Sequence, residues 1–148
     1  MKHLHLLLVE DNVGDVVLAE EAIVSIESRI SFIVVEGGKE ALLFLRNSSS
    51  LPGKALPQAI LVDINLPGMN GKELLRIIKS DPELDGIPVI VFSTNSSVKE
   101  IREVYNLGAD WYATKPDKND DYRKLILRIE QLLIEQTKCD SFEKFTIS

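Results

Sequence analysis

The chain has 148 residues, enough for one domain with a sizeable core and too few for two comfortable ones. Hydrophobic residues make up 45% and charged residues 27% of it, as in ordinary globular proteins. The formal net charge of −6 argues against a nucleic-acid surface, because phosphate backbones are bound by clustered Lys and Arg. The single Cys139 cannot form an internal disulfide, and no Cys/His cluster indicates a zinc site.

No apolar run approaches the roughly 18 residues that a membrane-spanning helix needs. The first residues, MKHLHLLLVED, include a short apolar stretch, but acids end it and no small-residue cleavage site follows. We therefore interpret this stretch as a first strand inside the fold, and we expect a cytoplasmic protein that does not bind membranes.

Short apolar runs and helical patterns alternate along the chain. The apolar runs predict five strands, at 4–10, 32–36, 59–64, 88–94 and 111–114. Apolar residues at i, i+3 and i+4 spacing predict five helices, one after Gly14 and the others at 38–47, 71–80, 96–108 and about 120–136. This alternation predicts an α/β fold, in which right-handed crossovers produce a parallel sheet with helices on both faces.

Two polar segments lie outside this pattern. The segment 47–58, NSSSLPGKALPQ, predicts a loop that is longer than most connections. The helical pattern is lost after Gln136, and we interpret residues 137–148 as a loosely held tail. No internal repeat or second domain is visible, so residues 1–136 are expected to form one domain without an effector domain after it.

Polar residues stand at the carboxyl ends of four of the predicted strands. In a parallel sheet these ends converge on one edge, where α/β proteins bind their ligands. Three closely spaced carboxylates repel one another unless a divalent cation neutralises them, and an oxygen-only ligand set favours Mg²⁺. The strand-end residues are Glu10, Asp11, Asp63, Ser93, Thr94 and Lys115.

A magnesium ion beside a carboxylate and a lysine is also the combination of groups that phosphoryl transfer uses. The metal and the ammonium neutralise charge on the transferring group, and the carboxylate of Asp63 can act as a nucleophile that forms an aspartyl phosphate.

Each of these residues also has a structural interpretation. Glu10 and Asp11 could cap the first helix, Asp63 could form an Asx turn before Pro67, and Lys115 could be a solvated surface lysine. Their joint placement at successive strand ends favours a functional site, because unrelated polar residues rarely gather by chance at one edge of a sheet.

The chain resembles the receiver domain of bacterial two-component response regulators, which have the CheY-like, flavodoxin-like fold. The resemblance covers roughly residues 4 to 135, and it implies a doubly wound five-stranded parallel sheet with strand order 2-1-3-4-5. The matching motifs, in the family's order, are LLLVEDN (6–12), LVDINLPGMNG (61–71), PVIVFST (88–94) and GADWYATKP (108–116).

The resemblance implies a metal-dependent phosphoacceptor site. Asp63 matches the residue that takes a phosphoryl group from the phosphohistidine of a sensor kinase. Glu10 and Asp11 match the acidic pair that holds Mg²⁺ together with Asp63, and the backbone carbonyl of Asn65 matches a further metal contact.

The resemblance also implies a switch. Ser93 matches the hydroxyl that turns toward the phosphoryl group, and Lys115 matches the lysine that contacts it. Tyr112 matches the aromatic residue whose ring moves after the hydroxyl. Pro116 matches a proline that usually follows a cis peptide bond.

Four residues depart from the commoner family pattern, among them Trp111 and Thr94, which are bulkier than the residues of some relatives at those places. Glu10 replaces an Asp, which lengthens the arm toward the metal, and Ser93 replaces a Thr but keeps the hydroxyl. The opening VEDNVGDVVLAEEA and the long loop at 47–58 are similar to the stand-alone regulators that pair with bacterial phytochromes and related hybrid kinases.

The implied function is a single-domain response regulator of a two-component system or phosphorelay, which acts on itself rather than as an enzyme on other substrates. Its partners would be a sensor histidine kinase or phosphotransfer protein and a downstream protein, without nucleic acid. The mixed charges of the fourth and fifth helices fit either a solvated face or a docking surface, including that of a homodimer.

Two other functions stay open on the sequence. A Mg²⁺-dependent phosphatase also uses an Asp nucleophile, but such enzymes usually carry a second Asp two residues later as general acid, where this chain has Asn65. A degenerate receiver would bind partners without phosphorylation, although the full set of site residues argues against it.

Overall fold

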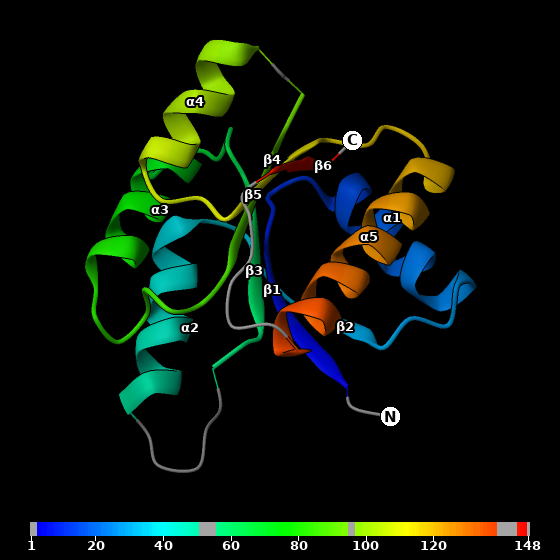
Figure 1. Ribbon diagram of the computed structural model, residues 1–148, viewed down its shortest axis with the longest axis horizontal. Helices are drawn as coiled ribbons and strands as arrows, with labels where there is room; N and C mark the ends of the chain where they lie inside the picture. The colour runs from blue at the N-terminus through cyan, green and yellow to red at the C-terminus, as the bar shows by residue number, and fades with distance from the viewer. Residues whose placement is uncertain (1–2, 51–55, 95–96, 139–144, 148) are drawn as a thin grey trace.

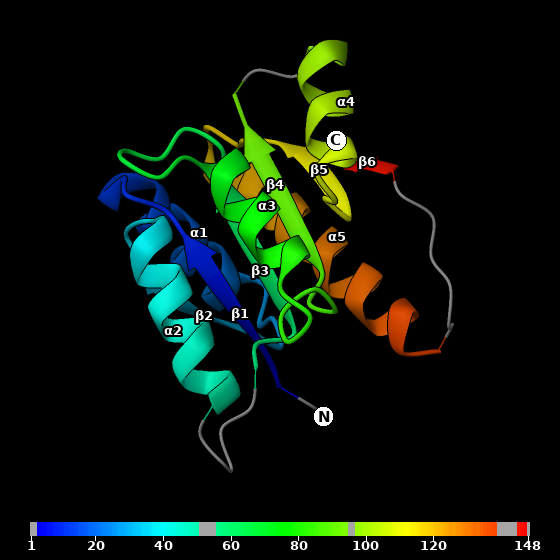
Figure 2. The ribbon, with the colours of Figure 1, turned by 90° about the vertical axis from the view of Figure 1, so that its left-hand side faces the viewer.

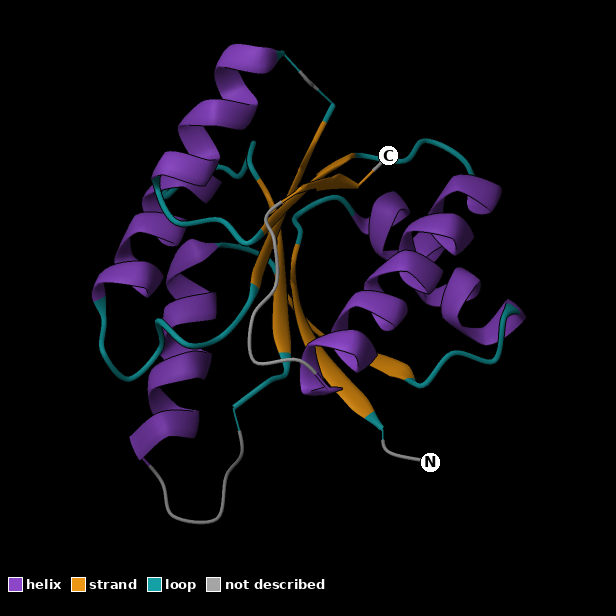
Figure 3. Cartoon of the chain, in the orientation of Figure 1, coloured by secondary structure: helices purple, strands orange, loops and turns teal. Residues whose placement is uncertain are grey.

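The computed structural model describes residues 3–50, 56–94, 97–138 and 145–147. Its described strands form one sheet whose neighbours all pair in parallel, in the order β2-β1-β3-β4-β5-β6 (Figures 1 and 3). The strands are β1 (Leu4–Val9), β2 (Ile30–Val35), β3 (Ala59–Asp63), β4 (Val89–Ser93), β5 (Trp111–Thr114) and β6 (Phe145–Ile147). The helices are α1 (Val13–Ser25), α2 (Gly38–Ser50), α3 (Gly71–Ser80), α4 (Val98–Asn106) and α5 (Asn119–Lys138).

The predicted fold class and the strand order 2-1-3-4-5 are confirmed. The main difference is β6, which pairs with β5 inside the segment interpreted as a tail. With only three residues, β6 is too short to give a periodic signal, yet it pairs with backbone groups that an edge strand would otherwise leave open. Helix α5 also runs two residues beyond Gln136, and α2 extends into the predicted loop, of which residues 51–55 lie outside the described chain.

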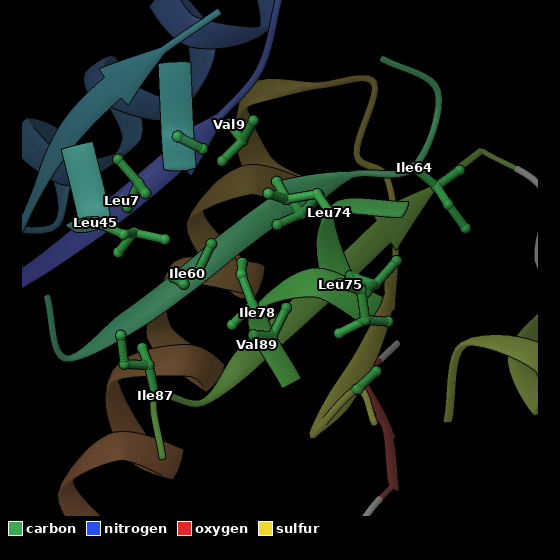
Figure 4. Close-up of a cluster of buried hydrophobic side chains, with 14 of the residues drawn as sticks. Leu7, Val9, Leu45, Ile60, Ile64, Leu74, Leu75, Ile78, Ile87 and Val89 are labelled. Atoms are coloured by element: carbon green, nitrogen blue, oxygen red, sulfur yellow. The ribbon is translucent and has the colours of Figure 1, made fainter. Parts of the chain in front are cut away.

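Helices cover both faces of the sheet, α1 and α5 on one face and α2, α3 and α4 on the other (Figures 1 and 2). Neighbouring residues of β1 point to opposite faces, so Leu6 and Leu8 join the core under α1 and α5 while Leu7 and Val9 join the core under α2, α3 and α4. Figure 4 shows part of the second core, where side chains of α3 interlock with those of β1, β3 and β4. Strands β3 and β4 are buried along their whole length, which explains why their sequences are continuous apolar runs.

Side-chain caps start three of the helices. Asn12, Asn70 and Ser97 each accept a hydrogen bond from the backbone N–H three residues ahead, at the starts of α1, α3 and α4. Helix α4 ends just before Gly108, which takes the positive φ of 109° that glycine adopts readily. No helix in the described part of the chain is long and apolar enough to cross a membrane.

The start of α3 lies directly against the end of β3. A Cβ atom on Gly71 would stand 2.6 Å from the backbone oxygen of Asp63 and 2.7 Å from the Cα of Ile64. The backbone N–H of Gly71 donates to the Ile64 carbonyl over 3.0 Å. Only glycine leaves room for this approach, so Gly71 fixes where the chain turns after Asp63.

We expect Gly71→Ala to lower the free energy of unfolding by about 1–3 kcal/mol, since the added methyl group must displace backbone rather than a flexible side chain. Gly86→Ala is the matched control, because a Cβ there meets nothing within 4 Å and the φ of Gly86 is not positive. Urea denaturation of both variants measures the difference. Equal stabilities for the two variants would contradict the argument.

Candidate functional site

In-register pairing brings the ends of the central strands together. Val9 of β1 pairs with Val62 of β3, so the next residues, Glu10 and Asp63, leave the sheet side by side. Asp63 in turn pairs with Phe92 of β4. Pairing of β4 with β5 brings the segment after β5 to the same edge.

Three of the predicted acids form one cluster at this edge. One carboxylate oxygen from each of Glu10, Asp11 and Asp63 lies within 4.8 Å of the others. Glu10 and Asp63 are only 2% and 4% exposed, whereas Asp11 is exposed. The cluster therefore has two buried carboxylates and one that faces solvent.

The ammonium group of Lys115 lies among these acids. Its Nζ is 2.8 Å from Asp63 Oδ2, 2.7 Å from Glu10 Oε1 and 3.1 Å from Asp15 Oδ2. It also stands 5.4 Å from the centre of the Phe92 ring, within cation–π range. Lys115 is thus a half-buried cation shared by three carboxylates rather than a solvated surface lysine.

Asp15 links this cation to α5. Its second oxygen, Oδ1, accepts a hydrogen bond of 2.9 Å from the hydroxyl of Tyr122, which is 2% exposed. Asp15 stands in the first turn of α1, and Tyr122 lies near the start of α5. One carboxylate therefore joins the strand-end site to the α1–α5 layer.

The structural interpretations of the acids are resolved individually. Asn12, not Glu10 or Asp11, caps α1, and the backbone N–H of Asn12 donates to Glu10 Oε2 over 3.2 Å. Asp63 does accept an Asx-type hydrogen bond of 3.0 Å on Oδ1, from the backbone N–H of Asn65. Because Lys115 uses the other oxygen, the turn orients the Asp63 carboxylate and does not replace its role in the cluster.

The predicted switch residues stand behind the acids. Ser93 is fully buried at the end of β4, and its carbonyl accepts a hydrogen bond of 2.8 Å from the backbone N–H of Lys115. Tyr112 is fully buried in the core under α2, α3 and α4, and its backbone N–H donates to the Tyr105 hydroxyl over 3.1 Å. The structure thus places Ser93 at the site edge and Tyr112 in the neighbouring core.

The prediction of a cis peptide bond before Pro116 is wrong for this structure, because its described residues contain no cis peptide bond. The trans form is the lower-energy isomer of a bond to proline. In this arrangement Lys115 makes its three carboxylate contacts.

Burial and neighbouring charge shift the acid–base behaviour of the site. Burial, and to a smaller extent the nearby Asp63 charge, raises the pKa of Glu10 to about 7, although Lys115 acts in the opposite direction. Burial disfavours the charged form of Lys115, but its carboxylate partners outweigh this and raise its pKa above the ordinary value. Burial and the hydrogen bond to Asp15 raise the pKa of Tyr122, so its hydroxyl remains a donor.

The residues fit a hard divalent cation. Glu10 Oε1 is buried with a charged neighbour 2.7 Å away but with no hydrogen bond of ordinary geometry. Such an oxygen suits a metal ion, which imposes no donor angle. The cluster offers carboxylate oxygens alone, the ligand type that Mg²⁺ and Mn²⁺ accept.

Sequence reasoning missed Asp15 and Tyr122. Asp15 looks like an ordinary first-turn acid of a helix, and Tyr122 fits the apolar stripe of α5. One signal was available: the side chains of a helix tilt toward its N-terminus, so an acid in the first turn of α1 leans toward the end of β1.

Without divalent metal, we expect the protein to lose stability as the pH rises from about 4.5 to about 7. In that window the folded state binds more protons than the unfolded state, because the pKa of Glu10 rises from 4.5 to about 7 on folding. Glu10→Gln should flatten this slope and raise Tm at pH 8 by a few degrees, since about 1 kcal/mol corresponds to about 4 °C for a domain of this size.

The measurement is Tm between pH 5 and pH 8 in the presence of a chelator. Glu83→Gln, a change at an exposed glutamate, is the control. Parallel pH profiles for the wild type and Glu10→Gln would contradict the assignment.

Comparison with known proteins places this geometry in a family. A model described as the response regulator receiver domain matches residues 6–127. Response regulator Rcp1 of Synechocystis sp. is 32% identical over 130 residues, which cover 88% of this chain and 88% of that protein. Among solved structures, the phosphorylated cyanobacterial phytochrome response regulator RcpA is 34% identical, with a TM-score of 0.78 over 90% of this chain and 96% of that chain.

The Mn²⁺-bound form of Rcp1 is 32% identical, with a TM-score of 0.74 over 88% of this chain and 94% of that chain. The family model alone spans most of the sequence, including every member of the acid cluster and Lys115. The chain therefore belongs to the response regulator receiver domain family of two-component systems.

Proposed function

We propose that this receiver domain accepts a phosphoryl group on Asp63 from the phosphohistidine of a sensor kinase or phosphotransfer protein. The observation that carries the proposal is the setting of Asp63: a buried carboxylate at a strand end, 2.8 Å from an ammonium and clustered with two further acids. A buried acid used only for structure would be satisfied by the ammonium and would need no additional acids beside it.

The transfer step is a displacement at phosphorus. A carboxylate oxygen of Asp63 forms a bond to phosphorus, and the bond from phosphorus to the imidazole nitrogen of the donor breaks. The electron pair of that bond remains on the imidazole. The Asn65 N–H on Oδ1 orients the Asp63 carboxylate, and Lys115 offsets negative charge on the transferring group.

Glu10, Asp11 and Asp63 are the residues that would hold Mg²⁺, with the Asn65 carbonyl as a further ligand. The ion supplies neutralisation of phosphoryl charge. Mn²⁺ in the related Rcp1 and the oxygen-only cluster of this chain support a divalent ion here.

The switch follows from the added charge. We infer that the Ser93 hydroxyl turns toward the phosphoryl oxygens and that Tyr112 adjusts in the adjoining core, which shifts the surface of α4, β5 and α5 between two populations. Ser93 and Tyr112 are both fully buried, so a change in either must repack its surroundings.

Partners are inferred from the relatives and from surface charge. Because RcpA is a phytochrome response regulator, we infer a phytochrome-like or related hybrid kinase as the input. Output would pass to a protein partner or a second copy of this chain. On α4, Glu100 and Glu103 form ion pairs with Lys72 of α3, so part of the mixed charge on α4 is used within the chain.

Asp63→Asn is expected to abolish incorporation of labelled phosphate from acetyl phosphate in the presence of Mg²⁺, because an amide oxygen is a far weaker nucleophile than a carboxylate. The readout is label retained on the protein after gel filtration. Asp85→Asn, an exposed aspartate away from the site, is the matched control and should label like the wild type.

Full labelling of Asp63→Asn would remove Asp63 from the phosphoacceptor role. Steady turnover of a small phosphate ester by the wild type, far beyond one equivalent, would favour a phosphatase instead.

A further inference from the structure

Asp15 contacts both the strand-end site and α5, and the proposed phosphoryl transfer gives it no role. Its Oδ2 lies 3.1 Å from Lys115 Nζ, and its Oδ1 accepts the Tyr122 hydroxyl over 2.9 Å. Its backbone N–H is held by the cap residue Asn12 over 3.1 Å. The carboxylate is therefore held by two groups from distant segments, and the backbone of Asp15 is fixed by a third.

We propose that Asp15 is a positioning residue for Lys115 and that it couples the phosphorylation state of Asp63 to helix α5 through Tyr122. This inference rests on the proposed function, and it names a route from the site to the α1–α5 layer of the fold. That layer lies on the opposite face of the sheet from Tyr112.

The argument begins with the ammonium of Lys115. The ammonium of Lys115 hydrogen-bonds to Asp63 Oδ2, and it also lies within ion-pair distance of Glu10 and Asp15. Negative charge added at Asp63 must draw Lys115 toward it, because no other lysine or arginine in the described chain forms an ion pair with Asp63. The contact to Asp15 is the longest of the three, so it is the first to weaken.

The second step concerns the carboxylate that Lys115 leaves. As Asp15 loses part of its cation, it becomes a stronger acceptor for the hydroxyl of Tyr122, its remaining side-chain donor. Tyr122 cannot turn to solvent, since it is buried in the core formed by the sheet, α1 and α5. A further hydrogen bond, from Arg123 Nε to Ser25 Oγ over 2.8 Å, also joins α5 to α1. The strengthened hydrogen bond from Tyr122 to Asp15 therefore changes how α5 packs against α1.

A merely structural role for Asp15 makes a different prediction. If Asp15 only held α1 and α5 together, the Tyr122 hydrogen bond would be the same with and without a phosphoryl group at Asp63. The two roles are distinguished by how Tyr122 responds to the state of the site.

The experiment is NMR of the protein with ¹³C at the ζ carbon of its tyrosines, titrated with beryllofluoride and Mg²⁺ as a phosphoryl mimic. The chain has 3 tyrosines, and each signal is assigned by a Tyr→Phe variant. We expect the Tyr122 signal to move downfield when beryllofluoride binds, because a stronger hydrogen bond gives the phenol more phenolate character. ¹⁹F NMR reports separately on whether beryllofluoride is bound.

Asp15→Asn keeps the shape of the side chain but removes its charge, and it should abolish the downfield shift while beryllofluoride still binds. Glu130→Gln is the matched control, since it neutralises a carboxylate that links α5 to Arg29 elsewhere in the fold. In that control, Tyr122 should respond as in the wild type.

Tyr122→Phe offers an independent test that does not need Asp15→Asn to fold. By linkage it should weaken beryllofluoride binding by on the order of a few-fold, since only the strengthening of one hydrogen bond separates the two states. Unchanged affinity in Tyr122→Phe, or a Tyr122 signal that stays in place when the wild type binds beryllofluoride, would overturn the coupling and leave the proposed function intact. Absence of bound beryllofluoride in the wild type would overturn the proposed function and the coupling with it.

Discussion

The Lys115 ammonium lies within 3.1 Å of one oxygen from each of Glu10, Asp15 and Asp63. Buried carboxylates are costly unless they are paired and hydrogen-bonded. One positive charge cannot balance three acids, and Asp11 adds a fourth at the rim. Burial, together with the remaining negative charge, raises the pKa of Glu10, and the same charge makes the cluster suitable for a divalent cation.

The fold maintains this unbalanced cluster by making each supporting element rigid. Strands buried on both faces cannot slip in register without moving apolar side chains from one core to the other. The start of α3 also packs directly against the end of β3, and the two backbones come this close only because Gly71 has no side chain. The fixed strand register and the close approach of Gly71 thus both hold the backbone of Asp63 in place. Repulsion among the acids therefore cannot relax by backbone movement.

Sequence patterns were informative wherever a residue's role followed from its position on an element. Asp63, Glu10 and Lys115 were predictable, because parallel strands bring their carboxyl ends to one edge and polar residues there stand out against apolar runs. Asp15 and Tyr122 were not, since their residue types are ordinary at those helical positions and their contact joins segments about a hundred residues apart. Strand β6 gave no signal because three residues carry too little periodicity. The peptide bond before Pro116 was mispredicted from family resemblance, which does not fix the isomer in one particular chain.

The proposed switch depends on this shared cation. A closer approach of Lys115 to Asp63 weakens its ion pairs with Glu10 and Asp15, since one ammonium is shared by all three carboxylates. The two acids differ in what lies behind them. Glu10 is held locally, by the backbone of Asn12, whereas Asp15 is held by a residue of α5. Negative charge added at Asp63 can therefore weaken two contacts of Lys115. The contact with Glu10 stays within the site, whereas the contact with Asp15 leads to another layer of the fold. Transmission to α5 requires only that the contact between Asp15 and Lys115 weaken. This contact is longer than the one between Glu10 and Lys115, and it is therefore the weaker of the two.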